Sequence, residues 1–283
     1  MIQVVPPPRR RRVLPGFGLS MGFTLTYLSL IVLIPICALL AKSATLGGSL
    51  FWQTITAPST VSAYKVSFGA SAIAAAINGV FGLIVAWTLV RYPFPTRRFF
   101  DALIDLPFAL PTAVAGIALS DLYSPHGWIG RWHLGSWGLD YSYTFGGIVI
   151  ALIFVGLPFV VRSVQPVLQE MDKDVEEAAE SLGATRAYTF RRVIIPALTP
   201  AWLSGFALAF ARALGEYGSV VFISRNQPNQ SEIVPTVIAS KVAENSPQAT
   251  AQATAIAVVL LVSSLVILLV INAIQWWSRR HEA

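Results

Sequence analysis

Six long apolar runs dominate this sequence of 283 residues. A bilayer core about 30 Å thick needs about 20 apolar residues in helical conformation. Only 12% of the residues are charged, against roughly 25% in soluble domains. The sequence therefore predicts an all-α integral membrane protein with six transmembrane helices, and it excludes an ordinary soluble domain. The expected spans cover residues 17–41, 66–90, 103–122, 144–165, 197–222 and 252–277.

The first run follows a stretch of three prolines and four arginines, Pro6 to Arg12, which is also the order found in a cleaved signal peptide. The apolar part of a signal peptide is usually 7–15 residues long. Because this run is longer, we expect it to remain as a transmembrane helix; cleavage after Ala41 or Ala44 is the alternative. The single cysteine, Cys37, lies in this run and is expected to pack like a small apolar residue.

The lysines and arginines other than Arg212 are unevenly distributed, with Arg162 counted on the side of the nearby inner loop. Fourteen fall on one side of the expected membrane and five on the other. Loops rich in these residues stay in the cytoplasm, so both termini, residues 1–16 and 278–283, are expected there. No loop reaches the roughly 50 residues of an independent domain, which leaves one membrane domain over residues 17–277. The inner loops are then 91–102 and 166–196, and the outer loops are 42–65, 123–143 and 223–251.

The inner loop 166–196 has the pattern of two short helices joined by a turn. Asp174 and Glu177 have the spacing of a capping box at a helix start. Gly183 stands where a helix end needs a left-handed residue, and Thr185 can cap a second helix that runs towards Pro196.

This loop resembles the EAA signature of ABC-importer permeases, which is Glu-Ala-Ala, a glycine, and an apolar stretch that ends in proline. The matching residues are Glu177, Ala178, Ala179, Gly183 and Pro196. The resemblance implies the type I (MetI-like) permease architecture, with the loop docking on a separate ATPase subunit. An amphipathic helix that only lies on the membrane is the alternative, although such helices are usually basic where this one is acidic.

Further segments resemble the permeases of sulfate and thiosulfate importers, of the T (or U) subunit type. The resemblance implies two ATP-binding subunits that hold ATP and Mg, a second and unlike permease subunit, an extracytoplasmic sulfate-binding protein, and the bacterial inner membrane. Molybdate and tungstate permeases share part of this pattern and remain an alternative. Arg225 and Asp121 depart from the family pattern, which places fine substrate selectivity in doubt. The segments are 109–119, 127–130, 157–168 and 210–218.

The sequence predicts no catalytic residues, metal ligands or cofactor in this chain. The only lysine followed by serine or threonine, Lys42, lacks the glycines of a phosphate-binding loop. The three histidines, His126, His133 and His281, do not have metal-binding spacing. Because the basic residues lie between apolar runs, nucleic acid is not an expected partner. Two alternatives come from other classes of protein. A secondary anion transporter would need internal repeats and free membrane carboxylates, and a membrane enzyme would need a set of reactive groups.

Two charged residues fall inside the fifth span, Arg212 and Glu216, four positions apart and so expected on one helix face. A charge at such depth costs about 2.5–3.5 kcal/mol on insertion scales and indicates function by default. Either the two residues form an ion pair that tightens packing, or Arg212 attracts a dianion while Glu216 limits its affinity.

Other polar or helix-breaking residues lie in the spans. Pro107 and Pro111 are expected to break the third span, followed by Thr112, and broken helices can bind anions through backbone N–H groups; kinks that only assist packing are the alternative. We expect Arg162 to extend to lipid phosphates, with a role in the pathway as the alternative. Asn78 and Asn272 are expected to form hydrogen bonds between helices.

Overall fold

The computed structural model describes residues 17–131 and 143–281, and these residues form helices and connections without strands. The predicted all-α membrane fold is therefore confirmed. The N-terminal arginines and residues 132–142 of the outer loop, which include His133, lie outside the described residues. Five helical segments are long and apolar enough to cross a membrane: α1 (Phe17–Ala44), α3 (Pro58–Arg91), α8 (Phe145–Glu170), the continuous segment Arg186–Leu214, and α14 (Pro247–His281) over Pro247–Trp276.

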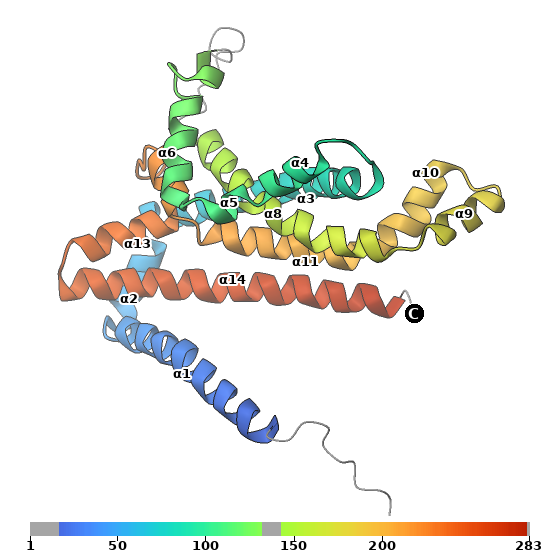
Figure 1. Ribbon diagram of the computed structural model, residues 1–283. Coiled ribbons are helices and arrows are strands. Elements are labelled where there is room, and N and C mark those ends of the chain that lie inside the picture. Colours follow the sequence, from blue (N-terminus) through green and yellow to red (C-terminus); the bar gives the residue numbers. More distant parts are fainter. Residues whose placement is uncertain (1–16, 132–142, 282–283) are drawn as a thin grey trace, which may run out of the picture.

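Three of these segments, α3, α8 and α11 (Ile195–Leu214), pack against one another and form the core (Figure 1). Small residues allow the close approach. A side chain at Gly82 would come within 2.8 Å of Val160, and one at Gly205 would come within 2.8 Å of the Val160 backbone. Association of helices in lipid depends on such close packing. The apolar side chains between the helices include Ile148, Val160, Val161 and Leu198, all at most 2% exposed.

The third expected span is built from three short helices: α4 (Arg97–Ile104), α5 (Leu106–Ala109) and α6 (Thr112–Tyr123). The chain turns at Asp105 and again at Leu110–Pro111, close to the expected prolines. The 12 residues of α6 extend about 18 Å, less than a bilayer core. Figure 1 shows α6 rising away from the layer of α3, α8 and α11.

The fifth expected span is interrupted too, which differs from the continuous run over 197–222. Helix α11 ends at Leu214 with Gly215 as its C-cap, and α12 (Gly218–Ile223) begins after a break. Gly215 and Gly218 stand on the two sides of the break. Glycine has a low helix propensity, so both residues favour an interruption here. Glu216 therefore lies just beyond the end of α11, in the break.

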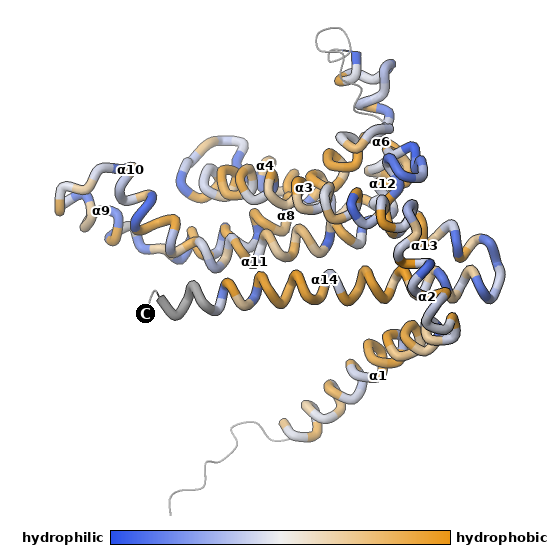
Figure 2. Tube along the Cα trace, turned by 180° about the vertical axis from the view of Figure 1, so that it is seen from behind, coloured by the Kyte–Doolittle hydropathy of each residue, from blue (hydrophilic) through white to orange (hydrophobic). Residues whose placement is uncertain are grey.

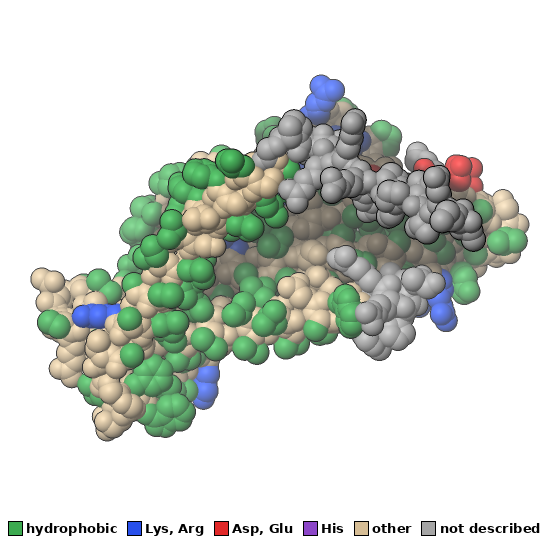
Figure 3. Space-filling model, turned by 90° about the horizontal axis from the view of Figure 1, so that it is seen from below, with side chains coloured by type: hydrophobic (Ala, Val, Ile, Leu, Met, Phe, Trp, Pro, Cys, Tyr) green, Lys and Arg blue, Asp and Glu red, His purple; other side chains and the backbone are tan. Residues whose placement is uncertain are grey.

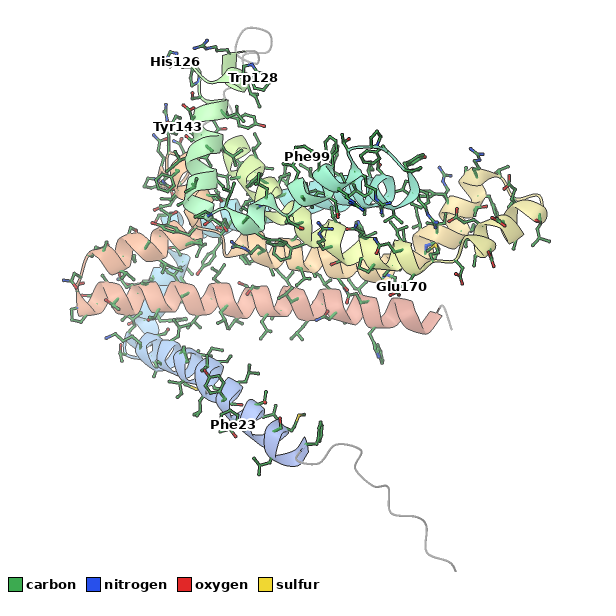
Figure 4. All side chains as sticks on the ribbon, in the orientation of Figure 1. Phe23, Phe99, His126, Trp128, Tyr143 and Glu170 are labelled. Carbon is green, nitrogen blue, oxygen red and sulfur yellow. The ribbon has the colours of Figure 1, made fainter. Side chains whose placement is uncertain are left out.

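Helices α2 (Gly47–Thr56), α13 (Val234–Ala243) and α14 lie beside this core. Helix α1 contacts α14 and α2, but its most apolar part is not buried against the chain. Cys37 is accordingly exposed, so the expectation of a packed thiol is wrong: the described residues do not bury this part of α1. Figure 4 shows Phe23 of α1 far from the helix layer, and Figure 3 shows apolar side chains over much of the molecular surface seen from below.

Candidate functional site

The loop after α8 folds as a helix, a turn and a second helix: α9 (Lys173–Ser181) and α10 (Arg186–Thr189), followed by the π-helical η1 (Phe190–Ile194). Thr185 caps α10 by accepting a hydrogen bond from the backbone N–H of Tyr188 at 3.3 Å. Gly183 has a φ of +82°, as a left-handed residue at a helix end requires. The N-cap of α9 is Asp172, two residues before the expected Asp174, and no side chain caps the helix, so the expected capping box is not formed.

The loop extends beyond the apolar helices, and Figure 2 shows α9 and α10 as a hydrophilic end of the molecule. Glu177, Ala178 and Gly183 are exposed and Ala179 is half-buried. Leu182, at the turn between the helices, is 89% exposed. An acidic residue, small residues and one exposed apolar side chain together form a surface suited to docking in a groove. Pro196 is separate from this surface, in the first turn of α11.

One ion pair connects this loop to the membrane helices, and sequence reasoning missed it. Arg91, the last residue of α3, donates a hydrogen bond to the carboxylate of Glu176 on α9. Beneath α9 lies a cavity of about 770 Å³. Its lining combines apolar residues of α3 and η1 with charged residues of the loop, among them Ile84, Trp87, Phe190, Glu177 and Arg186.

A second cluster of charged side chains lies at the break between α11 and α12. The guanidinium Nη1 of Arg212 is 2.6 Å from Oε2 of Glu216. The Glu216 side chain is 1% exposed and that of Arg212 is 37% exposed. Oε1 of Glu216 also accepts hydrogen bonds from the backbone N–H and the hydroxyl of Ser219, at 3.0 and 3.1 Å. The buried carboxylate therefore has both a counter-charge and partners at the start of α12.

The two helix breaks meet here, because α6 packs against α12. A side chain at Gly218 would come within 2.3 Å of the Thr112 hydroxyl, and one at Gly116 would come within 2.4 Å of the Ser219 carbonyl oxygen. Pro111 is the N-cap of α6 and is exposed. The structure thus brings Thr112 next to the segment that holds Glu216, although the two are far apart in the sequence.

Arg162 does not extend to lipid phosphates, contrary to the expectation. Its Nε and Nη2 donate to the two carboxylate oxygens of Asp105 at 2.9 and 2.6 Å. Its Nη1 donates to Asp101 at 2.7 Å and to Gln165 at 2.6 Å. The two aspartates accept hydrogen bonds from the guanidinium and tie the α4–α5 segment to α8. The N–H groups of Arg162 are therefore bonded within the protein and are not free for a lipid phosphate.

The other polar residues singled out in the sequence lie apart from these clusters. Asn78 is buried against Gly156, and its amide atoms have no hydrogen-bond partner within the described chain, so the expected hydrogen bond between helices is not made. Asn272 is exposed on α14. Arg225 lies over the ring of Tyr143, 5.7 Å from its centroid. Within residues 17–131 and 143–281, no three side chains of His, Cys, Asp or Glu are grouped to hold a metal ion.

Comparisons with known proteins agree with this architecture. The chain is 48% identical over 234 residues to the sulfate transport system permease protein CysT of Escherichia coli (strain K12), covering 83% of this chain and 84% of that one. It is 51% identical over 262 residues, 93% of both chains, to CysT of Synechococcus elongatus. A bacterial ABC transporter for import of the acidic polysaccharide alginate has the same fold, with a TM-score of 0.74, 19% identity, and coverage of 94% and 96%.

A family profile agrees as well. Residues 78–280 match the profile of the binding-protein-dependent transport system inner membrane component. This match covers well over half of the chain and includes the α9–α10 loop and both helix breaks. The chain therefore belongs to the family of binding-protein-dependent transport system inner membrane components.

Proposed function

We propose that this inner-membrane protein is a permease subunit of an ATP-driven importer of sulfate or thiosulfate and forms half of the translocation pathway. The observation that carries the proposal is the identity of 48% and 51% to two sulfate permeases, over more than four fifths of each chain. A molybdate or tungstate importer is the second candidate, because these oxyanions have similar shape and charge.

The loop α9–α10 is the proposed contact to the ATPase. It projects from the apolar helices, exposes Glu177, Ala178 and Leu182, and has a stable turn at Gly183. A short helix transmits displacement without bending when it is held in a groove. Two ATP-binding subunits would hold ATP and Mg, a second permease would supply the other half of the pathway, and an external binding protein would deliver the anion.

The helix breaks at Pro111–Thr112 and Gly215–Tyr217 are the proposed part of the pathway that changes shape. Short helices that end inside the membrane can shift without disturbing the packed core of α3, α8 and α11. Within this region, the buried carboxylate of Glu216 neutralises Arg212 and holds the start of α12. These contacts support a structural role of the pair over direct attraction of a dianion by Arg212.

Copurification tests the coupling loop. The tagged chain is extracted from its native membrane in mild detergent, and its partners are identified by mass spectrometry. An ATPase and a second permease should copurify with the wild type. The ATPase should not copurify with Glu177→Lys, because the reversed charge lies on the docking surface. Glu170→Lys is the matched control: Glu170 is also an exposed glutamate, at the end of α8 where the loop begins (Figure 4). Equal recovery of the ATPase with both variants would contradict the assignment.

Uptake of radiolabelled sulfate into proteoliposomes that contain the whole assembly tests the substrate. Uptake should require ATP and the binding protein, and unlabelled thiosulfate should compete better than molybdate. Stronger competition by molybdate would favour the second candidate. Uptake by this chain alone, without ATP, would instead identify a secondary anion transporter.

A further inference from the structure

The contact between Arg91 and Glu176 joins two parts of the chain that the backbone does not connect directly. Arg91 ends α3, and Glu176 lies in the middle of α9, 85 residues further along. The backbone connects α9 to α8 through Met171 and Asp172, and to α11 through α10 and η1. In the described part of the chain, this ion pair is the one side-chain ion pair between α9 and a membrane-spanning helix.

Arg91 is held firmly at the α3 end of this contact. Its side chain is only 12% exposed, and its guanidinium carbon lies 5.5 Å from the centroid of the Trp87 ring. Trp87 in turn packs edge-on against Phe190 of η1, with centroids 5.5 Å apart and planes at 89°. A cation over an aromatic face is attracted by the ring, and a cation at a helix C-terminus is also favoured by the helix dipole. The position of the guanidinium is therefore fixed from several sides.

Helix α9, in contrast, is not packed closely on α3. The cavity of about 770 Å³ lies between them, with Leu83 and Ile84 of α3 on one side and Glu177 and Glu180 of α9 on the other. Apolar packing across this space is therefore limited. Because the ion pair spans the edge of the cavity, a displacement of α9 reaches α3 directly through Arg91, whereas the contact of Phe190 with Trp87 transmits it only by way of α10 and η1.

We propose that Arg91 is a positioning residue that transmits movement of α9 to α3, so that three membrane helices, and not only α8 and α11, respond to the ATPase. This inference rests on the proposed function of the α9–α10 loop. Its physical basis is that the ion pair is shielded on the arginine side, where water weakens the attraction less than at an open surface.

The test uses the complete importer in proteoliposomes, with its ATPase, second permease and binding protein, and radiolabelled sulfate as the probe. The measured quantity is sulfate translocated per ATP hydrolysed. Arg91→Gln and Glu176→Gln should each lower this ratio by about tenfold, as expected for residues that carry coupling between sites, while ATPase copurification stays at the wild-type level. Arg98→Gln is the matched control, since Arg98 is an exposed arginine on α4 without an ion pair in the described structure.

The exchanged variant, Arg91→Glu with Glu176→Arg, separates transmission from folding. It restores the ion pair in reverse and should recover the ratio to within about threefold of the wild type. The single variant Glu176→Gln also separates transmission from folding, because Glu176 is 32% exposed and lies outside the packed core. A wild-type ratio in both single variants, or a failure of the exchange to recover the ratio, would overturn the proposal. Absence of ATP-driven uptake by the wild type would overturn the proposed function as well.

Discussion

At the scale of single residues, the carboxylate of Glu216 is a buried charge that needs partners within the protein. A charge without partners in a low-dielectric interior is strongly unfavourable. Here Arg212 supplies the opposite charge, and Ser219 supplies two hydrogen bonds. Both partner residues lie within four positions of Glu216 in the sequence, so the residues around the break compensate the buried charge locally.

Removal of one partner should therefore be costly. Arg212→Ala leaves the Glu216 carboxylate buried without its counter-charge, and breaking a buried pair costs roughly 3–5 kcal/mol. Part of Arg212 is exposed, so we expect the lower end, a fall in Tm of roughly 5–10 °C in detergent. Arg212→Ala combined with Glu216→Gln should recover most of this loss, because the amide carries no charge. Equal Tm values for the single and double variants would contradict this account.

Glu232 makes stability depend on pH. Partial burial raises the pKa of its carboxyl group above the ordinary value, and nearby Lys241 lowers it by a smaller amount. The folded state thus holds the proton more tightly than the unfolded state. The resulting stabilisation is fully present below the unfolded-state pKa and is lost as the pH rises through the folded-state pKa.

The wild type should accordingly gain stability relative to Glu232→Gln as the pH falls from about 7 to about 5, the range just above the ordinary pKa of a glutamate. Thermal unfolding of both proteins in detergent over this range measures the difference. The size will be modest because the side chain is only half-buried. A difference that is constant with pH would show that Glu232 does not titrate differently in the folded state.

At the scale of helices, the crossing of α6 and α12 depends on small residues at the contact. Gly116→Ala places a methyl group 2.4 Å from the backbone oxygen of Ser219, which cannot move aside as a flexible side chain could. We expect Gly116→Ala to separate the two helices and to lower Tm by several degrees, as overpacking costs roughly 1–3 kcal/mol. Gly69→Ala is the control, since its nearest neighbour, Cζ of Phe145, is 3.9 Å away. Similar Tm values for both variants would contradict the close contact.

Local features of the helices could be predicted from the sequence, and contacts between distant elements could not. The left-handed Gly183, the Thr185 cap and the break near Pro111 follow from the preferences of these residues in short segments. The break at Gly215 was missed because the apolar run continues through it, although glycine on both sides of Glu216 was a usable signal. The partners of Arg162 and Arg91 lie 57 and 85 residues away, and no local rule connects such positions.

At the scale of the whole molecule, the chain leaves apolar surface that it does not cover itself. Helix α1 is largely apolar, and its most apolar part is not buried against the other helices. Side chains such as Leu19, Phe23 and Ile34 are at least 60% exposed. Lipid or another membrane subunit must cover this surface, since exposed apolar area of this extent is unfavourable in water.

The arrangement in the membrane gives the last prediction. The excess of lysine and arginine predicts that the α9–α10 loop lies in the cytoplasm and the segment between α12 and α13 lies outside. In a Cys37→Ser background, which removes the native thiol, Gln227→Cys should react in intact cells with a thiol reagent that does not cross the membrane. Ser181→Cys should react only after the membrane is opened. Both positions are exposed, so a difference in labelling reports the side of the membrane and not burial. Labelling of Ser181→Cys in intact cells would reverse the topology and would remove the coupling loop from the side where ATP is available.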